Sequence, residues 1–148
     1  MSTHRPLEGK RILITGASSG IGQATATMLA DRGSRVLAVA RRADRLSELA
    51  QHPGIDAHVC DVTSDTEVDA LAAVLGADGG VDVLINNAGG AAGMDSVEAS
   101  SIDDWRWMYE VNVIGVKRMI STFLPLLRQA ANNRGGADIL TVTSTAGF

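Results

Sequence analysis

The segment TGASSGIG, at positions 15–22, has the residue types and spacing of a site that binds an anion. It follows an apolar run at residues 12–14 and leads into a helical pattern, so a strand, a turn and a helix follow one another. The first N–H groups of a helix lack partners within it, and the helix dipole favours an anion there. Gly16 permits a tight turn, Gly20 lets the backbone approach a pyrophosphate, and Gly22 lets the helix sit close to the sheet. The segment therefore predicts a site for the phosphates of a nucleotide.

The glycine spacing of this segment is G-x-x-x-G-x-G, which differs from the usual G-x-G-x-x-G of dinucleotide sites. It is not a P-loop either, because no Lys-Ser or Lys-Thr pair follows the last glycine. The alternative is a turn without a ligand, in which Ser18 or Ser19 simply caps the helix. The strand before the turn and the helix after it favour the ligand.

Two arginines follow the second apolar strand, in the sequence VLAVARRAD. Ala40, Arg41 and Arg42 stand where an NAD site places an acidic residue for the ribose 2′-hydroxyl. Guanidinium groups suit a 2′-phosphate, whereas the alternative is that both are solvated surface charges. Cations at the start of a helix oppose its dipole unless an anion arrives, and Asp44 offsets them only in part. We therefore predict NADP(H) rather than NAD(H), with Arg41 as the first candidate and Arg42 as the second.

Asp61 comes directly after the third apolar strand. At the carboxyl end of a strand it could bind the amino group of an adenine ring, or it could cap the helix that begins nearby. Both interpretations stay open on the residues alone. Cys60, just before it, is predicted to be a small core residue.

Apolar strand patterns alternate with helical patterns along the chain. The predicted strands cover residues 11–15, 35–40, 55–60, 81–86 and 138–143. A helix is predicted after each of the first four strands, the third with a Ser64/Glu67 capping box and the fourth running from about Ile102 to Ala131. Continuous apolar strands joined by helices indicate a parallel sheet covered on both faces. We predict one α/β domain over residues 1–148, a doubly wound Rossmann fold with strand order 3-2-1-4-5 that stops after the fifth strand.

Composition argues against several other classes of protein. The net charge is −4 with scattered basic residues, which excludes the basic face that a nucleic-acid partner needs. A single cysteine excludes an internal disulfide and is typical of a reducing compartment. The first residues have no apolar signal core, and no stretch approaches a membrane span. We predict a cytoplasmic protein with no nucleic-acid, membrane or metal partner.

Five motifs in order make the chain resemble the classical short-chain dehydrogenases/reductases over essentially its whole length. They are TGASSGIG (15–22), DV (61–62), NNAG (86–89), VNVIG (111–115) and TVTSTAG (141–147). One of them alone would carry little weight, whereas the set with the right intervening elements is highly specific.

The resemblance implies roles for particular residues of this sequence. The loop for the pyrophosphate and ribose would be Gly16, Ser18, Ser19, Gly20, Ile21 and Gly22. The adenine contacts would be Asp61 and Val62, and the cofactor ribose would be lined by Asn87, Ala88 and Gly89. The amide of Asn86 would tie the fourth strand to its neighbours. The catalytic residues would be Asn112 and Ser144, with Thr143 in a place often held by serine.

Asn112 interrupts an apolar helical stripe, which is costly unless its amide is hydrogen-bonded. The stripe runs through Trp105, Met108, Val116, Met119 and Phe123. In the family this asparagine would hold a water in a proton relay, and the alternative is a structurally satisfied amide. The hydroxyl of Ser144, past the fifth strand, could hold a substrate carbonyl or alcohol oxygen. Without the resemblance it would be a turn residue.

The family's Tyr-x-x-x-Lys, which protonates the developing alkoxide, does not occur in this chain. The only tyrosine is Tyr109, which Val113 follows four positions later, and we predict that it packs. We expect the N-terminal part of an NADP-dependent oxidoreductase of carbonyls or secondary alcohols, inactive by itself and homodimeric or homotetrameric in full-length form. The alternatives are a non-catalytic NADP-binding or regulatory module and a methyltransferase, and Ala40–Arg42 argues against the latter.

Overall fold

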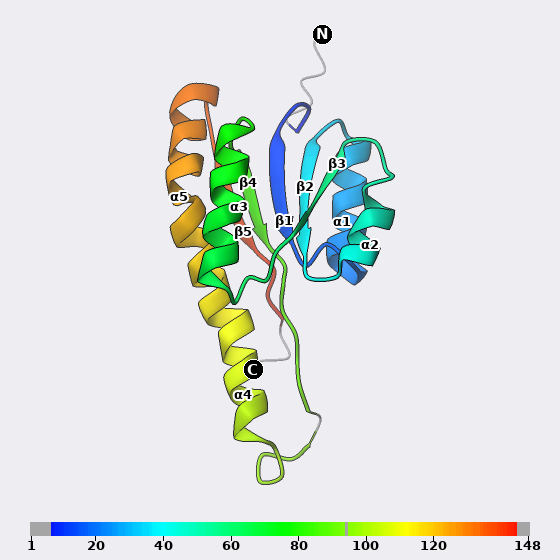
Figure 1. The fold of residues 1–148 in the computed structure, drawn as a ribbon, viewed down its shortest axis with the longest axis vertical. Coiled ribbons are helices and arrows are strands. Elements are labelled where there is room, and N and C mark those ends of the chain that lie inside the picture. Colours follow the sequence, from blue (N-terminus) through cyan, green and yellow to red (C-terminus); the bar gives the residue numbers. More distant parts are fainter. Residues whose placement is uncertain (1–6, 94, 145–148) are drawn as a thin grey trace.

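A five-stranded parallel sheet forms the centre of the protein in the computed structural model, which describes residues 7–93 and 95–144 (Figure 1). The strands are β1 (Arg11–Thr15), β2 (Arg35–Ala40), β3 (Ile55–Val59), β4 (Val83–Asn86) and β5 (Asp138–Thr141). Their order is β3-β2-β1-β4-β5, as predicted. Because the order reverses between β1 and β4, a crevice for ligands is expected at the carboxyl ends of these two strands.

Helices cover both faces of the sheet, and Figure 1 shows them as two groups. One group is α1 (Gly20–Asp31) and α2 (Ala43–Leu49). The other is α3 (Asp65–Ala77) and a continuous helical rod made of α4 (Ile102–Tyr109), the π-helical turn η1 (Glu110–Ile114) and α5 (Gly115–Arg134). This is the predicted doubly wound α/β arrangement.

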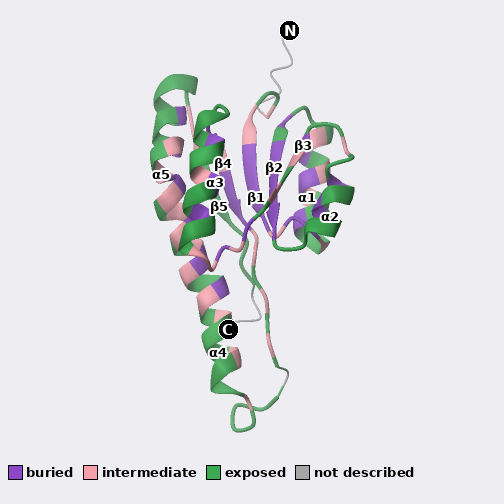
Figure 2. Ribbon diagram, viewed as in Figure 1, coloured by how far each residue is buried: buried purple, intermediate pink, exposed green. Residues whose placement is uncertain are grey.

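Each face of the sheet has its own apolar core, because successive strand residues point to opposite faces. Leu13 and Leu37 pack with α3 and α5, whereas Ile12, Ile14 and Val36 pack with α1 and α2. β1 and β2 are therefore buried along almost their whole length (Figure 2). This double burial explains why the strands read as continuous apolar runs.

Three strands are shorter than predicted. β3 ends at Val59, β4 begins at Val83, and β5 ends at Thr141. Before β4, the buried side chain of Asp82 accepts the backbone N–H of Arg11 at 2.8 Å, so a carboxylate takes the place of a strand partner there. After β5, Val142 N still donates to Asn86 O at 2.9 Å, although regular pairing has ended.

The long predicted helix is interrupted by the π turn and runs on to Arg134, where Gly135 takes a left-handed conformation (φ 77°). Its first part projects beyond the carboxyl edge of the sheet (Figure 1), and no residue of α4 is buried. Tyr109 is 60% exposed, so the prediction that it packs is wrong. The apolar stripe is buried only in α5, at Met119 and Phe123.

No helix in the described part of the chain is both long and apolar enough to cross a membrane. Within residues 7–93 and 95–144, the structure also brings together no group of three or more His, Cys, Asp or Glu residues that could hold a metal ion.

Candidate functional site

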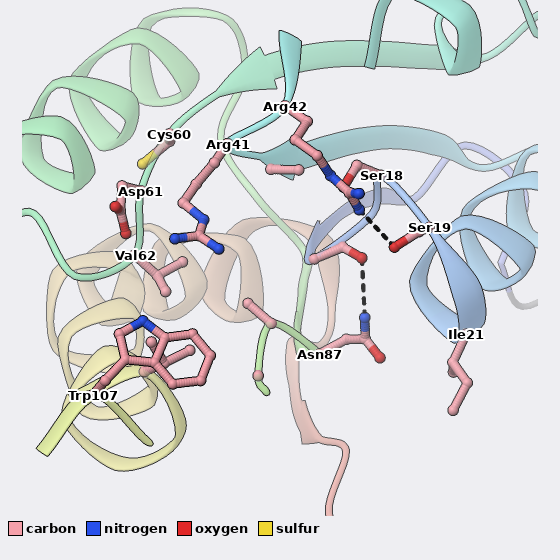
Figure 3. A pocket seen from close by; sticks show the side chains of 15 residues that line it. Ser18, Ser19, Ile21, Arg41, Arg42, Cys60, Asp61, Val62, Asn87 and Trp107 are labelled. Atoms are coloured by element: carbon pink, nitrogen blue, oxygen red, sulfur yellow. Dashed lines mark hydrogen bonds between the residues drawn. The ribbon is translucent and has the colours of Figure 1, made fainter. Parts of the chain in front are cut away.

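A pocket of about 540 Å³ lies at the carboxyl ends of the strands (Figure 3). It gathers all the predicted nucleotide-binding residues except Gly20 and Gly22: Gly16, Ser18, Ser19, Ile21, Arg41, Arg42, Asp61, Val62, Asn87, Ala88 and Gly89. Four further lining residues were not predicted: Ala40, Cys60, Trp107 and Val111. Neither Asn112 nor Ser144 lines this pocket.

The turn after β1 is packed tightly against the loop that follows β4. Gly16 has φ +66°, and a Cβ on it would lie 2.8 Å from Ala88 Cα. A Cβ on Gly22 would lie 2.2 Å from Gly16 O and 2.4 Å from Asn87 Nδ2. The closest approach at Gly22 is therefore to Gly16 and Asn87, the residues that directly follow β1 and β4. Gly20 has φ +56° with open space beside it, which leaves its backbone accessible.

Thr15, at the end of β1, joins that turn to the loop after β4 and is 1% exposed. Its Oγ1 accepts the backbone N–H groups of Asn87 at 3.0 Å and Ala88 at 2.9 Å. In return, Asn87 Nδ2 donates to Thr15 O at 3.2 Å and Gly16 O at 3.3 Å. These bonds fix the floor of the pocket. A polar residue ending an apolar strand was the only sequence signal for Thr15, and its partners are more than 70 residues away.

Arg42 is tied to the glycine-rich turn. Its Nη2 donates to Ser18 Oγ at 3.0 Å and to Ser19 Oγ at 2.8 Å, and its Nε donates to Ser18 Oγ at 3.3 Å. Ser19 holds the N-cap position of α1, but its side chain makes no capping hydrogen bond. The hydroxyls of Ser18 and Ser19 therefore accept hydrogen bonds from Arg42, and the Ser19 hydroxyl does not cap the helix (Figure 3).

Arg41 lines the same pocket with an exposed side chain. Its guanidinium makes no hydrogen bond or ion pair with any residue of the described ranges. The two adjacent arginines are thus in different states: one is engaged by the loop, and the other has all its donors available.

The turn after β3 is held by its own side chains. Asp61 Oδ1 accepts Thr63 N at 2.9 Å and Thr63 Oγ1 at 2.8 Å. Ser64, not Asp61, caps α3 by accepting Glu67 N at 3.3 Å, so the capping interpretation of Asp61 is wrong. Glu67 Oε2 accepts Asp61 N at 2.8 Å and not Ser64 N, so only half of the predicted capping box forms.

Cys60 is buried, as predicted for a core residue. Burial, with a smaller contribution from the negative charges of Glu67 and Asp61, raises the pKa of its thiol to about 11. Although it lines the pocket, Cys60 is therefore a protonated, unreactive thiol at neutral pH.

Asn112 lies in the π turn and holds the loop after β4. Its Oδ1 accepts Gly90 N at 3.0 Å, and its Nδ2 donates to Gly90 O at 2.8 Å. On the other side of that glycine lies the Trp107 indole, because a Cβ on Gly90 would be 2.6 Å from Trp107 Cη2. Both polar atoms of the exposed Asn112 side chain are thus hydrogen-bonded to Gly90, which positions the loop after β4.

Two further predicted residues lie near the end of β5. Ser144 is exposed and stands three residues past Thr141, while residues 145–147 of the TVTSTAG motif lie outside the described residues. Asn86 is 2% exposed, and neither polar atom of its side chain has a hydrogen-bond partner among the described residues. The expectation that its amide ties β4 to its neighbours is therefore wrong for this part of the chain; its backbone does so, because Asn86 pairs with Thr141 of β5 and its oxygen accepts Val142 N.

Comparison with known proteins identifies the family of this chain. Residues 10–148 match the family model described as short chain dehydrogenase. The chain belongs to the short-chain dehydrogenase family. An uncharacterized oxidoreductase of Mycobacterium tuberculosis (strain ATCC 25618 / H37Rv) is 50% identical over 138 residues, which cover 93% of this chain and 52% of the relative. The NADP-dependent 3-hydroxy acid dehydrogenase YdfG of Shigella flexneri is 32% identical over 139 residues, covering 92% of this chain and 54% of the relative.

Solved short-chain dehydrogenase structures share the fold. The Pseudomonas aeruginosa RhlG/NADP active-site complex superimposes with a TM-score of 0.88 at 34% identity, covering 99% of this chain and 59% of that chain. NADH-dependent reductase A1-R′ complexed with NAD gives a TM-score of 0.85 at 33% identity, covering 97% of this chain and 62% of that one. The chain spans about half the length of the curated relatives it matches.

Proposed function

We propose that this chain is the nucleotide-binding part of an NADP(H)-dependent oxidoreductase that interconverts a carbonyl and a secondary alcohol. The observation that carries the choice of NADP(H) is that the end of β2 contributes two arginines and no acidic residue to the pocket. The relatives support a nicotinamide cofactor but not its type, because one solved neighbour is complexed with NADP and another with NAD.

The two arginines have different roles in the proposed binding of the nucleotide. Arg42 donates from Nε and Nη2 to the hydroxyls of Ser18 and Ser19. These hydrogen bonds hold the glycine-rich turn in the conformation that would face the ligand. Arg41 has its donors available in the pocket, and we assign the 2′-phosphate to it. A guanidinium bound to a phosphate makes charge-assisted hydrogen bonds, which are about twice as strong as neutral ones.

The electrostatics of this corner favour a multiply charged anion. Ser19 is the N-cap of α1 and Arg42 is the N-cap of α2, so the positive ends of two helix dipoles meet two guanidinium groups. Without an anion these positive charges oppose one another. The pyrophosphate and 2′-phosphate of NADP(H) would neutralise them.

The residues also fit the remaining parts of the cofactor. Asp61 and Val62 would contact the adenine, and Asn87, Ala88 and Gly89 would line a ribose. Bound NADP(H) would supply or accept the hydride. Ser144 would hold the substrate oxygen by a hydrogen bond, and Asn112 would position the loop at Gly90 and, through it, the cofactor wall.

The sequence of this chain contains no Tyr-x-x-x-Lys, so it lacks the group that would protonate the substrate oxygen. We therefore propose that the chain by itself binds the nucleotide without turning over a substrate. A second candidate is a non-catalytic NADP-binding module. A small carbonyl or alcohol substrate, a cytoplasmic location and a homodimeric or homotetrameric full-length form complete the first proposal.

Isothermal titration calorimetry of the chain with NADPH, NADH and S-adenosylmethionine tests this proposal. We expect tighter binding of NADPH than of NADH and no binding of S-adenosylmethionine. Equal affinity for the two nicotinamide nucleotides would contradict the 2′-phosphate assignment, and binding of neither would contradict the function. Assay of a chain extended by any downstream sequence that carries Tyr-x-x-x-Lys distinguishes the enzyme from the binding module.

A further inference from the structure

We propose that Trp107 binds the adenine ring of the nucleotide, an assignment that rests on the proposed function. Trp107 lines the pocket although it belongs to α4, a helix without a buried residue that projects past the sheet. The other tryptophan of this helix, Trp105, is 53% exposed and lies outside the pocket. A large aromatic side chain that lines a nucleotide pocket from an otherwise exposed helix is suited to contact a planar ring of the ligand.

The pocket has two chemically different ends (Figure 3). At one end, Arg42 and the serine hydroxyls of the glycine-rich turn present polar groups suited to phosphates. At the other end, the figure shows the Trp107 indole near Val62, Asp61 and the guanidinium of Arg41. An adenine ring has apolar faces and a hydrogen-bonding edge, so it fits the end that offers a flat apolar wall beside a carboxylate.

This apolar end is built by contacts between the turn after β3 and the helical rod. Arg118, from α5, donates to Val62 O at 2.9 Å. A Cβ on Gly115 would lie 3.1 Å from Val62 Cγ2, so the turn packs on the first residue of α5. Val111, one helical turn after Trp107, also lines the pocket and is 7% exposed. Val62 and Val111 are thus held by the packing of the turn and the helical rod, and Trp107 lines the same pocket from the helical turn before Val111.

The indole, which is 38% exposed, contacts the loop after β4 before any ligand arrives. Its Cη2 lies so close to Gly90 that a Cβ there would be 2.6 Å away. Gly90 itself is fixed by both polar atoms of the Asn112 amide. A wall that is already ordered loses little conformational entropy on binding, which favours its use as a platform for a planar ring. The competing explanation is that Trp107 only supports the loop at Gly90.

Calorimetry with adenosine 2′,5′-bisphosphate, which has the adenine but no nicotinamide, tests the assignment. Trp107→Ala should weaken its binding about five- to 150-fold, as expected for loss of a base–aromatic contact. Trp107→Phe keeps a flat ring and should stay within about five-fold of the wild type. Trp105→Ala is the matched control and should leave the affinity unchanged. Trp105 does not line the pocket, and its indole Nε1 donates to Ser100 Oγ, with a donor–acceptor distance of 3.0 Å.

Fluorescence separates ring contact from loop support. In the Trp105→Phe chain, Trp107 is the only tryptophan, and we expect adenosine 2′,5′-bisphosphate to change its emission and to protect it from acrylamide. Lost affinity in Trp107→Ala without these optical changes would mean that Trp107 only supports the loop, which overturns the proposal. Unchanged affinity in Trp107→Ala would overturn it as well. If the wild type bound NADPH but not the bisphosphate, the adenine assignment alone would fail; if it bound neither, the proposed function would fail with it.

Discussion

Replacing Arg41 with alanine should weaken NADPH binding and leave NADH binding nearly unchanged, because only NADPH carries the 2′-phosphate. The structure sets the size of the effect. Arg41 is exposed and has no partner in the described ranges, so its removal leaves no internal group unpaired. A charge-assisted hydrogen bond contributes about 1.5–3 kcal/mol. Solvent access to this pocket reduces that to about 1–2 kcal/mol.

This free energy corresponds to a loss of about five- to thirty-fold in NADPH affinity. The assay is calorimetric titration of NADPH and NADH into wild type, Arg41→Ala and Arg45→Ala, an exposed arginine of α2 that does not line the pocket. Arg41→Asp should reverse the preference by adding repulsion. Arg42→Ala should weaken both nucleotides, because it releases Ser18 and Ser19. An NADPH/NADH affinity ratio that is the same in Arg41→Ala and wild type would refute the assignment.

The other predictions concern stability. Gly22→Ala should lower the free energy of unfolding by more than about 2 kcal/mol, because its Cβ would overlap the carbonyl oxygen of Gly16. Urea unfolding measures this loss, and a smaller loss would show that the turn can shift. Thr15→Val should cost about 1–3 kcal/mol in the same assay, since two partly buried N–H groups lose their acceptor. A neutral result would contradict the role of Thr15 in fixing the turn after β1 to the loop after β4. In the folded chain the pKa of the Cys60 thiol is about 11, whereas in the unfolded chain the thiol ionises near pH 9. Burial of the protonated thiol therefore contributes fully to the free energy of unfolding below pH 9, and this contribution is lost as the pH rises from 9 to 11. Comparing urea midpoints of wild type and Cys60→Ala at pH 8 and pH 10.5 tests this: the stability advantage of wild type should shrink at the higher pH.

The strand patterns were sufficient for the fold. Both faces of β1 and β2 are buried, so their residues are apolar throughout and the strands are visible without knowledge of their neighbours. Boundaries were less accurate where a side chain replaces a backbone partner, as Asp82 does before β4. The exposure of Tyr109 was missed because helical periodicity does not show that a helix extends beyond the sheet it packs on.

The residues that line the candidate pocket could be picked out from the sequence, but their contacts could not. Glycines, serines and arginines at the ends of strands are local signals, and the pocket gathers nearly all of them. The different states of Arg41 and Arg42 depend on the distance from α2 to the glycine-rich turn, more than 20 residues earlier in the chain. The apolar stripe of the sequence included Trp105 and left out Trp107, whereas in the structure Trp107 lines the pocket and Trp105 does not. Which side of the helix faces the pocket depends on how the helix packs beside the sheet, and helical periodicity does not show this.

The amino-acid sequence by itself determined the parallel sheet, the glycine-rich turn and the arginines after β2, because burial periodicity and backbone freedom are properties of neighbouring residues. Only the tertiary structure decided which hydroxyl, amide and guanidinium groups bond to one another. Thr15 with Asn87, Arg42 with Ser18, and Asn112 with Gly90 are pairs made by strand order and helix packing. A hydrogen bond requires its two atoms within about 3.5 Å, and for residues far apart in sequence only the assembled fold sets that distance.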